Sequence, residues 1–338
     1  MSRTAEITLE YQNIIPAPPV QPQELYKAAC SNDAVTIDSW ANIWVDNITA
    51  NRVAVGGDFA TQGVGKLFGQ LQHKTCILAG SGPSLKVNGA QLKDRGGVPL
   101  ISCLHNFHFF EDRGVKPDFY VSLDAGAIVM EEIAEGGALT EAEYWDKTRD
   151  HTLVAYIGSH PDLVKKWQGK LYFFNAGMPH GDTKTKADAA AGFRTMLGTG
   201  GNVLGACLYL AKGILGCAAV AFVGADFAFD YKNRFHGWES KYDANLGQVI
   251  RVTDIYGIKV NTWKSYNNFK CWFEYIACTV PGSYFNCTEG GTLGAHPDGN
   301  IAQFKYLDLK DFIDMATMNE HLRAQCENPA ENHKIMLF

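Results

Sequence analysis

The 338-residue chain lacks several features that define common classes of protein. Its nine cysteines are scattered, and no two have CxxC spacing, so a zinc site and a disulfide scaffold are both disfavoured. No window holds the roughly 18 apolar residues that span a bilayer. The opening residues, MSRTAEITLEYQ, lack the apolar core of a secretory signal. We therefore expect a cytoplasmic protein with free thiols and no membrane span.

An excess of charge of either sign is also missing. The net charge is −6 and only 20% of the residues are charged, so no global basic character indicates nucleic-acid binding. Hydrophobic residues make up 46% of the chain, which is enough to form a substantial core.

Three catalytic signatures are absent. The histidines show neither HxxxH nor HExxH spacing, and no GxSxG elbow occurs. The stretch 63–67 ends like a phosphate-binding P-loop, but Ala60 replaces its first glycine and Leu67 replaces its magnesium-binding hydroxyl. These differences argue against a P-loop, a zinc peptidase and a serine hydrolase.

The chain does contain a regular alternation of apolar runs and helical patterns. The predicted strands are 75–79, 99–103, 119–123, 152–157, 170–174, 218–223 and 283–286, and a helix is predicted at 307–325. Continuous apolar runs suit strands that are covered on both faces. We therefore predict an α/β fold, with a Rossmann-like doubly wound, mostly parallel sheet and helices on both faces.

The first part of the chain differs from the rest. Residues 13–22 are rich in proline and incompatible with a helix, and an amphipathic piece follows at 35–49. We interpret residues 1–70 as an N-terminal extension packed on a nucleotide-binding transferase domain at 71–330.

Ligands of doubly wound sheets bind beyond the carboxyl ends of the strands. The first predicted strand is followed there by Gly80-Ser81-Gly82-Pro83-Ser84. The two glycines allow a phosphate or a ribose to approach the backbone, and the next helix offers free amides to an anion, with Lys86 nearby. The third glycine of a dinucleotide fingerprint is missing, so a tight turn without a ligand is an equal alternative.

A second glycine segment, Thr199-Gly200-Gly201-Asn202, opens a predicted helix at 203–215. It suits a second anion or substrate cradle, but an ordinary helix cap by Thr199 or Asn202 explains it equally well.

Acids and a histidine follow other predicted strands. Asp124 and Asp226 could hold Mg²⁺ or a ribose hydroxyl, or transfer a proton, and the alternative is a capping role. The loop 227–242 suits a lid, and His236 is its candidate for proton transfer because a free imidazole titrates near neutrality. Glu289 lies on a further rim segment, where Glu289-Gly290-Gly291 follows a strand, and we expect Glu289 to contact the donor.

Four stretches occur in one order: ILAGSGPSL, GVKPDFYVSLDAG, GTGGNVLGACLYLAKGILGCAAVAFVGADFAFD and FNCTEGG. Over residues 75–295 the chain resembles the MptE-like superfamily, which includes 6-hydroxymethylpterin diphosphokinases and Maf-type flagellin glycosyltransferases. It is more distantly similar to Campylobacter-type sialyltransferases. The resemblance implies a Rossmann-like domain that binds a nucleotide or a nucleotide-activated donor.

The resemblance also suggests roles for particular positions. It implies donor contacts by Gly80, Ser81, Gly82, Pro83, Ser84, Asn106, Gly200, Gly201 and Asn202. Asp124 ends the PDFYVSLD segment typical of the superfamily. His236 stands where the sialyltransferases place a basic histidine, although the surrounding FHGW differs from their motif.

These features favour a glycosyltransferase that moves a sugar from a nucleotide-activated donor to a hydroxyl acceptor. Asp226 or His236 is then the base, and Trp238, Tyr242 and Tyr256 are candidates for stacking on a sugar. The acceptor is left open between a glycan, a protein and a modified base, and oligomerisation is also open.

The alternative is an ATP diphosphokinase that acts on a small pterin-like hydroxymethyl compound. It would use Mg²⁺ held by Asp124 and Asp226. A third hypothesis is a nucleotide-binding module that has lost catalysis.

Overall fold

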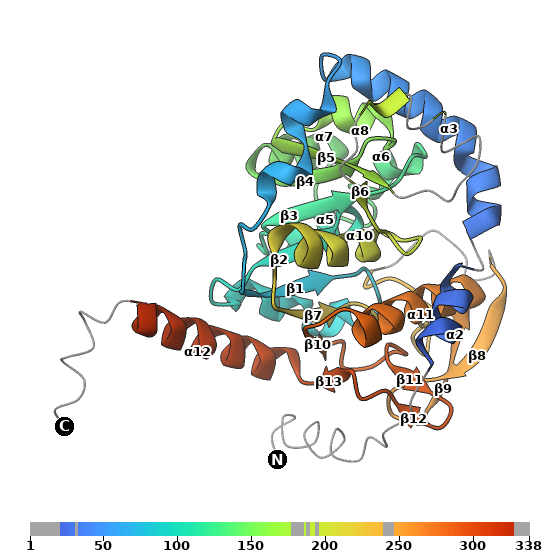
Figure 1. Cartoon of the computed structure of the whole chain (residues 1–338), viewed down its shortest axis with the longest axis vertical. Coiled ribbons are helices and arrows are strands. Elements are labelled where there is room, and N and C mark those ends of the chain that lie inside the picture. The colour runs from blue at the N-terminus through green and yellow to red at the C-terminus, as the bar shows by residue number, and fades with distance from the viewer. Residues whose placement is uncertain are drawn as a thin grey trace.

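The computed structural model describes residues 21–30, 33–176, 186, 190–192, 196–238 and 247–327, and a large parallel sheet dominates it (Figure 1). Nine strands of the described chain form this sheet in the order β13-β10-β7-β1-β2-β3-β4-β5-β6. Each pair of neighbours is parallel. The strands are β1 (Thr75–Ala79), β2 (Leu100–Cys103), β3 (Phe119–Ser122), β4 (Thr152–Tyr156), β5 (Lys170–Ala176), β6 (Met196–Leu197), β7 (Ala219–Val223), β10 (Ser283–Asn286) and β13 (Phe304–Tyr306). The predicted Rossmann-like fold is confirmed.

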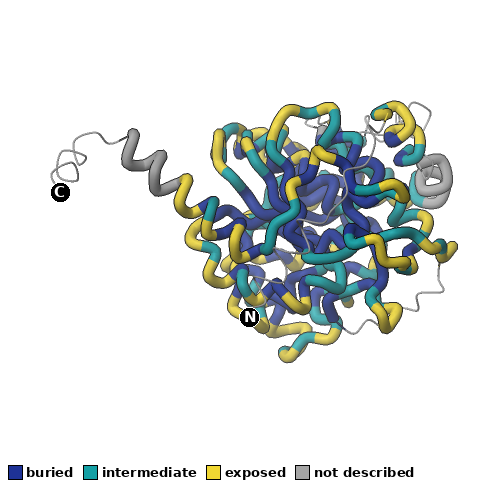
Figure 2. Tube along the Cα trace, turned by 90° about the horizontal axis from the view of Figure 1, so that it is seen from below, coloured by how far each residue is buried: buried dark blue, intermediate teal, exposed yellow. Residues whose placement is uncertain are grey.

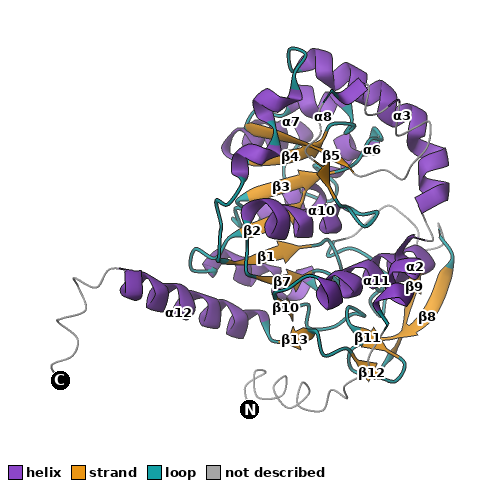
Figure 3. Cartoon of the chain, viewed as in Figure 1, coloured by secondary structure: helices purple, strands orange, loops and turns teal. Residues whose placement is uncertain are grey.

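The apolar composition of the strands explains this arrangement. In β1, Cys76, Ile77, Leu78 and Ala79 are all fully buried, because helices cover both faces of the sheet (Figures 1 and 3). The covering helices include α4 (Leu85–Asn88), α5 (Phe107–Glu111), α6 (Ile128–Glu132), α7 (Glu141–Lys147), α8 (Pro161–Lys166), α10 (Val203–Tyr209) and α11 (Lys264–Thr279). Burial of one such leucine contributes about 2 kcal/mol to folding.

Each predicted run contains an observed strand, but several short strands were not predicted. The strands β6 and β13 are too short to show periodicity. Two antiparallel pairs lie outside the main sheet: β8 (Val249–Thr253) with β9 (Lys259–Trp263), and β11 (Ala295–His296) with β12 (Gly299–Asn300). The predicted helix at 203–215 corresponds to α10, which continues as a π-helical segment at Leu210–Leu215.

The described part of the N-terminal extension packs on the main domain. Helix α2 (Pro22–Ala29) contacts α11, and α3 (Asp33–Ala54), which contains residues 35–49, contacts α8. Taken as a whole, α3 is not strongly amphipathic, unlike the expectation for this piece. Asn47 Nδ2 donates to the carbonyls of Ala125 (3.0 Å) and Gly158 (3.1 Å), beyond the ends of β3 and β4. The short turns η2 (Phe59–Gln62) and η3 (Val64–Leu67) lead into β1. Residues 1–20, and with them most of the proline-rich stretch, lie outside the described residues.

The last helix, α12 (Leu309–Glu327), corresponds to the helix predicted at 307–325. It projects from the body of the molecule (Figures 1 and 2). Its first turns pack on the body through Leu309, Phe312, Ile313 and Ala316. In the described part of the chain, none of the helices combines the length and the apolar character that crossing a membrane requires. Each cysteine whose side chain is described there is a free thiol.

Candidate functional site

The order of the strands defines a crevice between β1 and β7. From β1 the chain adds β2 to β6 on one side, whereas β7, β10 and β13 lie on the other, so the direction of winding reverses at this point. Ligands of doubly wound sheets bind in such a crevice. A cavity of about 710 Å³ lies elsewhere, while the crevice itself opens into a cavity of about 340 Å³, within the usual range for small-ligand sites.

The cavity at the crevice has a polar side and an aromatic side. The polar side includes Ser81, His105, Asp124, Glu132, Asn202 and His236. The aromatic side includes Phe227, Phe235, Tyr266 and Phe269. Among the described residues that line the cavity there is no lysine or arginine, and Lys86 is exposed elsewhere.

The glycine loop after β1 borders this cavity, as the sequence predicted. Its backbone is fixed to the end of β7, because Gly80 N–H donates to Val223 (2.9 Å) and Gly82 N–H to Gly224 (2.8 Å). A Cβ atom on Gly80 would lie 2.5 Å from the carbonyl oxygen of Gly224. Close packing of two loops therefore already requires glycine here. Pro83 and Ser84 are not among the residues that line the cavity.

Asp226 has a different position from the one expected. Its carboxylate accepts hydrogen bonds from Ser84 N–H (3.1 Å) and Ser84 Oγ–H (2.7 Å). Burial raises the pKa of Asp226 to about 7, although the hydrogen bonds from Ser84 oppose the shift. Asp226 does not line the cavity, so the structure places the residue that was expected to be the base and a metal ligand behind Gly82, where it joins two loops. The amide of Ser84, expected to be free for an anion, is occupied by this carboxylate.

Asp124 is at the cavity, as predicted. It is half-buried after β3, and burial raises its pKa while the nearby His105 lowers it. The carboxylate that shares the cavity with it is Glu132 of α6, rather than Asp226. Mg²⁺ typically uses one or two protein carboxylates together with substrate phosphates. No group of three or more His, Cys, Asp or Glu side chains in the described residues could hold a metal by itself.

His236 lines the cavity, and its pKa is shifted well away from neutrality. Burial, and after it the charge of His105, lower the pKa of His236 to about 3. The sequence assumed an exposed imidazole, so this expectation is corrected. A neutral His236 can still accept or donate a hydrogen bond to a ligand.

His105 is a second histidine at the cavity. It follows β2 and lines the cavity, and its Nε2 lies 3.2 Å from Glu135 Oε2. Its ring packs edge-on against His236, with centroids 4.6 Å apart. A histidine oriented by a carboxylate has the arrangement of a proton-transfer pair. The feature of the sequence that points to His105 is its position just beyond a predicted strand.

The aromatic residues that line the cavity differ from those expected to stack on a sugar. Trp238 is buried and stacks on His236 at 5.2 Å, outside the cavity lining. Tyr256 does not line the cavity, and Tyr242 lies outside the described residues. Aromatic side chains at the cavity come instead from the segment after β7 and from α11, including Phe227 and Phe269.

Asn106 and Glu289 were also expected to contact the donor. Asn106 is fully buried, and its Nδ2 donates to the carbonyls of Ala79 (3.2 Å) and Gly80 (3.0 Å). Glu289 Oε1 accepts from Asn88 Nδ2 (3.3 Å) and from the backbone of Leu309 (3.3 Å). Neither lines the cavity: Asn106 holds the loop after β1, whereas Glu289 joins α4 to the start of α12.

The second glycine segment contributes one residue to the cavity. Asn202 lines it, and its Oδ1 caps α10 by accepting from Gly205 N–H (2.9 Å). Gly200 and Gly201 have φ values of 56° and 78°. Trp272 and Phe269 occupy the space that their side chains would need. These glycines therefore serve backbone conformation and packing, and not direct contact with the cavity.

Comparisons with known proteins identify the family of the chain and a solved structure with a similar fold. The family model described as 6-hydroxymethylpterin diphosphokinase MptE-like matches residues 57–232, just over half of the chain, so the protein belongs to the MptE-like family. A search of curated proteins gave no match.

Among solved structures, the fold is similar to that of the Maf glycosyltransferase from Magnetospirillum magneticum AMB-1. The TM-score is 0.52 at 16% identity, and the match covers 81% of this chain. It spans only 42% of the length of the glycosyltransferase chain. At this identity the likeness shows a shared fold.

Proposed function

We propose that the protein is a glycosyltransferase that binds a nucleotide-activated sugar in the crevice between β1 and β7. Membership of the MptE-like family supports a transferase, and the Maf glycosyltransferase has the same fold. The observation that carries the proposal is the cavity of about 340 Å³ at the point where the direction of winding reverses. It joins a polar side to an aromatic side, as a donor with a sugar or base ring and hydroxyl groups requires.

His105 is the group in this cavity best placed to remove a proton from an acceptor hydroxyl. Glu135 holds one nitrogen of the His105 ring at 3.2 Å, which leaves the other nitrogen for the substrate. Glu135 also stabilises the imidazolium that forms when the proton arrives. Asp124 lies in the same cavity and can accept hydrogen bonds from sugar hydroxyls.

The second candidate is a Mg²⁺-dependent diphosphokinase, and one observation favours it. The described lining of the cavity carries Asp124 and Glu132 without a lysine or arginine. The charge of a triphosphate therefore needs a cation at this site, and these two carboxylates fit a magnesium ion that is shared with phosphate oxygens.

A thermal-shift panel separates the two candidates. The purified protein is heated with CMP, UDP, GDP or ATP, each with Mg²⁺ or with EDTA. Stabilisation grows as ligand concentration exceeds Kd, so a matching nucleotide raises Tm. A shift with CMP or UDP in EDTA supports sugar transfer, whereas a shift with ATP that requires Mg²⁺ supports the kinase. If Glu132→Gln and Asp124→Asn leave every shift unchanged, the ligand does not bind in this cavity.

A further inference from the structure

Two pairs of cysteines meet in the core, and the proposed transfer uses neither of them. Cys207 of α10 donates a hydrogen bond from its thiol to the sulfur of Cys103, the last residue of β2. Cys76 of β1 donates in the same way to Cys217, in the connection that leads to β7. All four are buried free thiols. Each pair therefore holds two sulfur atoms in hydrogen-bond contact without a covalent bond between them.

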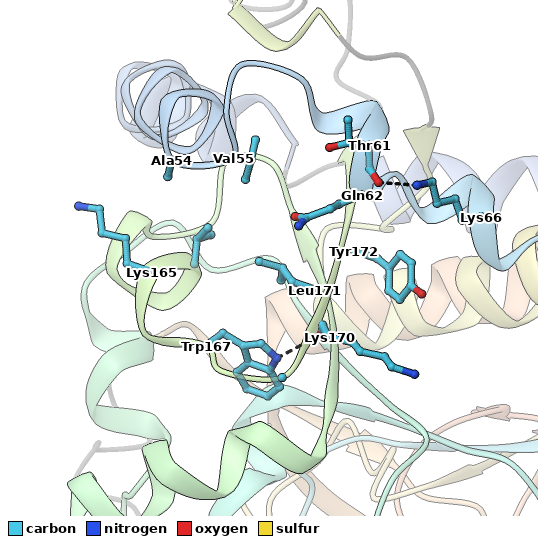
Figure 4. Close-up of a pocket in the computed structure, with 12 residues that line it drawn as sticks. Ala54, Val55, Thr61, Gln62, Lys66, Lys165, Trp167, Lys170, Leu171 and Tyr172 are labelled. Carbon is cyan, nitrogen blue, oxygen red and sulfur yellow. Dashed lines mark hydrogen bonds between the residues drawn. The ribbon is translucent and has the colours of Figure 1, made fainter.

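The two pairs differ in how a small molecule can reach them. Cys103 lines the cavity at the crevice and is 7% exposed, and it is the one cysteine among the described residues of that lining. Cys76 and Cys217 line neither this cavity nor the larger one beside β5 (Figure 4), whose described lining contains no cysteine. A molecule that enters the crevice therefore reaches Cys103, whereas neither cavity leads to the second pair.

The Cys103–Cys207 pair lies between two elements that form the wall of the cavity. Helix α10 packs on β2 (Figure 1), and Asn202, Val203 and Leu204 at its start line the cavity together with Cys103. Cys207 is fully buried one turn further along α10. Burial, and after it the hydrogen bond to Cys103, raise the pKa of the Cys207 thiol well above its usual value, so this thiol stays protonated near neutrality. Cys103 is the sulfur that a reagent meets, and Cys207 lies directly beside it.

We propose that Cys103 and Cys207 form an oxidisable dithiol, which a hydroperoxide in the crevice cavity converts into a disulfide. The thiolate of Cys103 attacks one oxygen of the hydroperoxide, the O–O bond breaks, and the other oxygen leaves as water or an alcohol with the proton that Cys103 gave up. Cys103 is then a sulfenic acid. The sulfur of Cys207 displaces its hydroxyl group, which leaves as water with the Cys207 proton. Two thiols are oxidised in total and one hydroperoxide is reduced.

The disulfide changes the wall of the cavity. Its sulfur atoms are about 2.05 Å apart, closer than those of two thiols in hydrogen-bond contact. Closing the bond draws α10 and the end of β2 together, and both elements line the cavity. A dithiol reductant reverses the step by thiol–disulfide exchange and is itself oxidised. The oxidation does not depend on the transferase reaction, whereas its effect on ligand binding rests on the proposed function of this cavity.

Peptide mapping tests for the disulfide. The folded full chain is treated with a few equivalents of hydrogen peroxide, its remaining thiols are blocked with N-ethylmaleimide in denaturant, and trypsin is added. Trypsin releases Cys103 in the peptide 96–113 and Cys207 in the peptide 195–212, each with a single cysteine. Mass spectrometry should find these two peptides joined, and dithiothreitol should separate them. The peptides 75–86 and 213–232, which carry the second pair, should be joined at least about tenfold less.

Two serine variants separate the roles of the sulfur atoms. In Cys207→Ser the sulfenic acid of Cys103 has no thiol beside it, so its reaction with dimedone should rise at least about tenfold above that of the wild type. Cys217→Ser is the matched control, because it breaks the second pair and should leave the Cys103–Cys207 bond unchanged. Thermal unfolding of both variants and of the oxidised wild type checks that they are folded.

The proposal is overturned if Cys103 stays a thiol in the folded chain, or if peroxide joins Cys76 to Cys217 as readily. It is also overturned if Cys103 proceeds to a sulfinic acid while Cys207 keeps its thiol, or if the two peptides join only in the unfolded chain. The oxidised protein should show at least about a twofold smaller thermal shift with the nucleotide from the panel. If the reduced protein shifts with no nucleotide, the proposed function fails, and the linked peptides still decide the disulfide.

Discussion

The carboxylate of Asp226 accepts two hydrogen bonds from Ser84, at 3.1 Å from its backbone nitrogen and 2.7 Å from its hydroxyl oxygen. These contacts join the loop after β7 to the loop after β1, on the two sides of the crevice. The carboxylate is buried, and Gly82 packs directly against it. Asp226 therefore sets the spacing of the two loops that a donor would have to contact.

The first prediction concerns the pH dependence of stability. Burial raises the pKa of Asp226 to about 7 in the folded protein, compared with about 3.9 for an unperturbed Asp in the unfolded chain. Between these values the folded state holds more protons, so its free energy of unfolding should fall as pH rises from about 4 to about 7. The size of the pKa shift of Asp226 limits this fall in the free energy of unfolding to about 4 kcal/mol. Asp226→Asn should remove this contribution.

Urea unfolding at several pH values measures how the free energy of unfolding depends on pH. Asp46→Asn, at an exposed position on α3, is the control and should keep the slope of the wild type. An Asp226→Asn variant whose stability depends on pH just as strongly as the wild type contradicts the assignment.

The second prediction concerns Gly82. A Cβ atom there would lie 2.1 Å from Asp226 Oδ2, so Gly82→Ala must displace the carboxylate. We expect a loss of about 1–3 kcal/mol in stability and a smaller thermal shift with nucleotide. In the Asp226→Ala background the same change should cost less, because the atom it displaces is gone.

Gly290→Ala is the matched control for this pair of residues, since no atom lies within 4 Å of its added Cβ. Equal losses for Gly82→Ala with and without Asp226 show that the two positions are not coupled.

The third prediction concerns proton transfer by His105. His105→Gln should lower kcat on the donor identified by the nucleotide panel about 10²–10⁴-fold while the thermal shift with nucleotide persists. Glu135→Gln should lower kcat less and leave KM nearly unchanged, because Glu135 acts on the reaction through the His105 ring, 3.2 Å away, which it orients and stabilises as an imidazolium. His73→Asn, at an exposed position with φ 65° that Asn tolerates, should be silent. Full activity of His105→Gln excludes this residue as the base.

The fourth prediction concerns the attachment of α3. Asn51 is fully buried, and its Nδ2 donates to the carbonyls of Ile157 (2.9 Å) and Ser159 (2.8 Å). Asn51→Ala leaves both carbonyls without this donor and should cost about 1–3 kcal/mol in urea unfolding. Thr49→Ala removes an exposed hydrogen bond within the helix and should change stability by less than about 0.5 kcal/mol. A similar, small effect of both changes means that α3 docks mainly through other contacts.

The sequence by itself determined the parallel sheet and the family. Continuous apolar runs such as 76–79 suit only strands that are covered on both faces, and the order of the glycine and acidic motifs identified the MptE-like pattern. The rule that ligands bind beyond strand ends also selected Gly80, Gly82, Asp124 and Asn202, which line one cavity. These features depend on local residue type and spacing, and both can be read along the chain.

Only the tertiary structure decided what each polar group does. Ser84 and Asp226 are 142 positions apart, and nothing in the local sequence of either indicates that they share hydrogen bonds. Burial among aromatic rings gives His236 a low pKa, whereas a carboxylate from a distant segment makes His105 the candidate base. Desolvation and hydrogen bonding depend on distances in space, so the roles of these side chains became defined only when the folded chain brought their neighbours together.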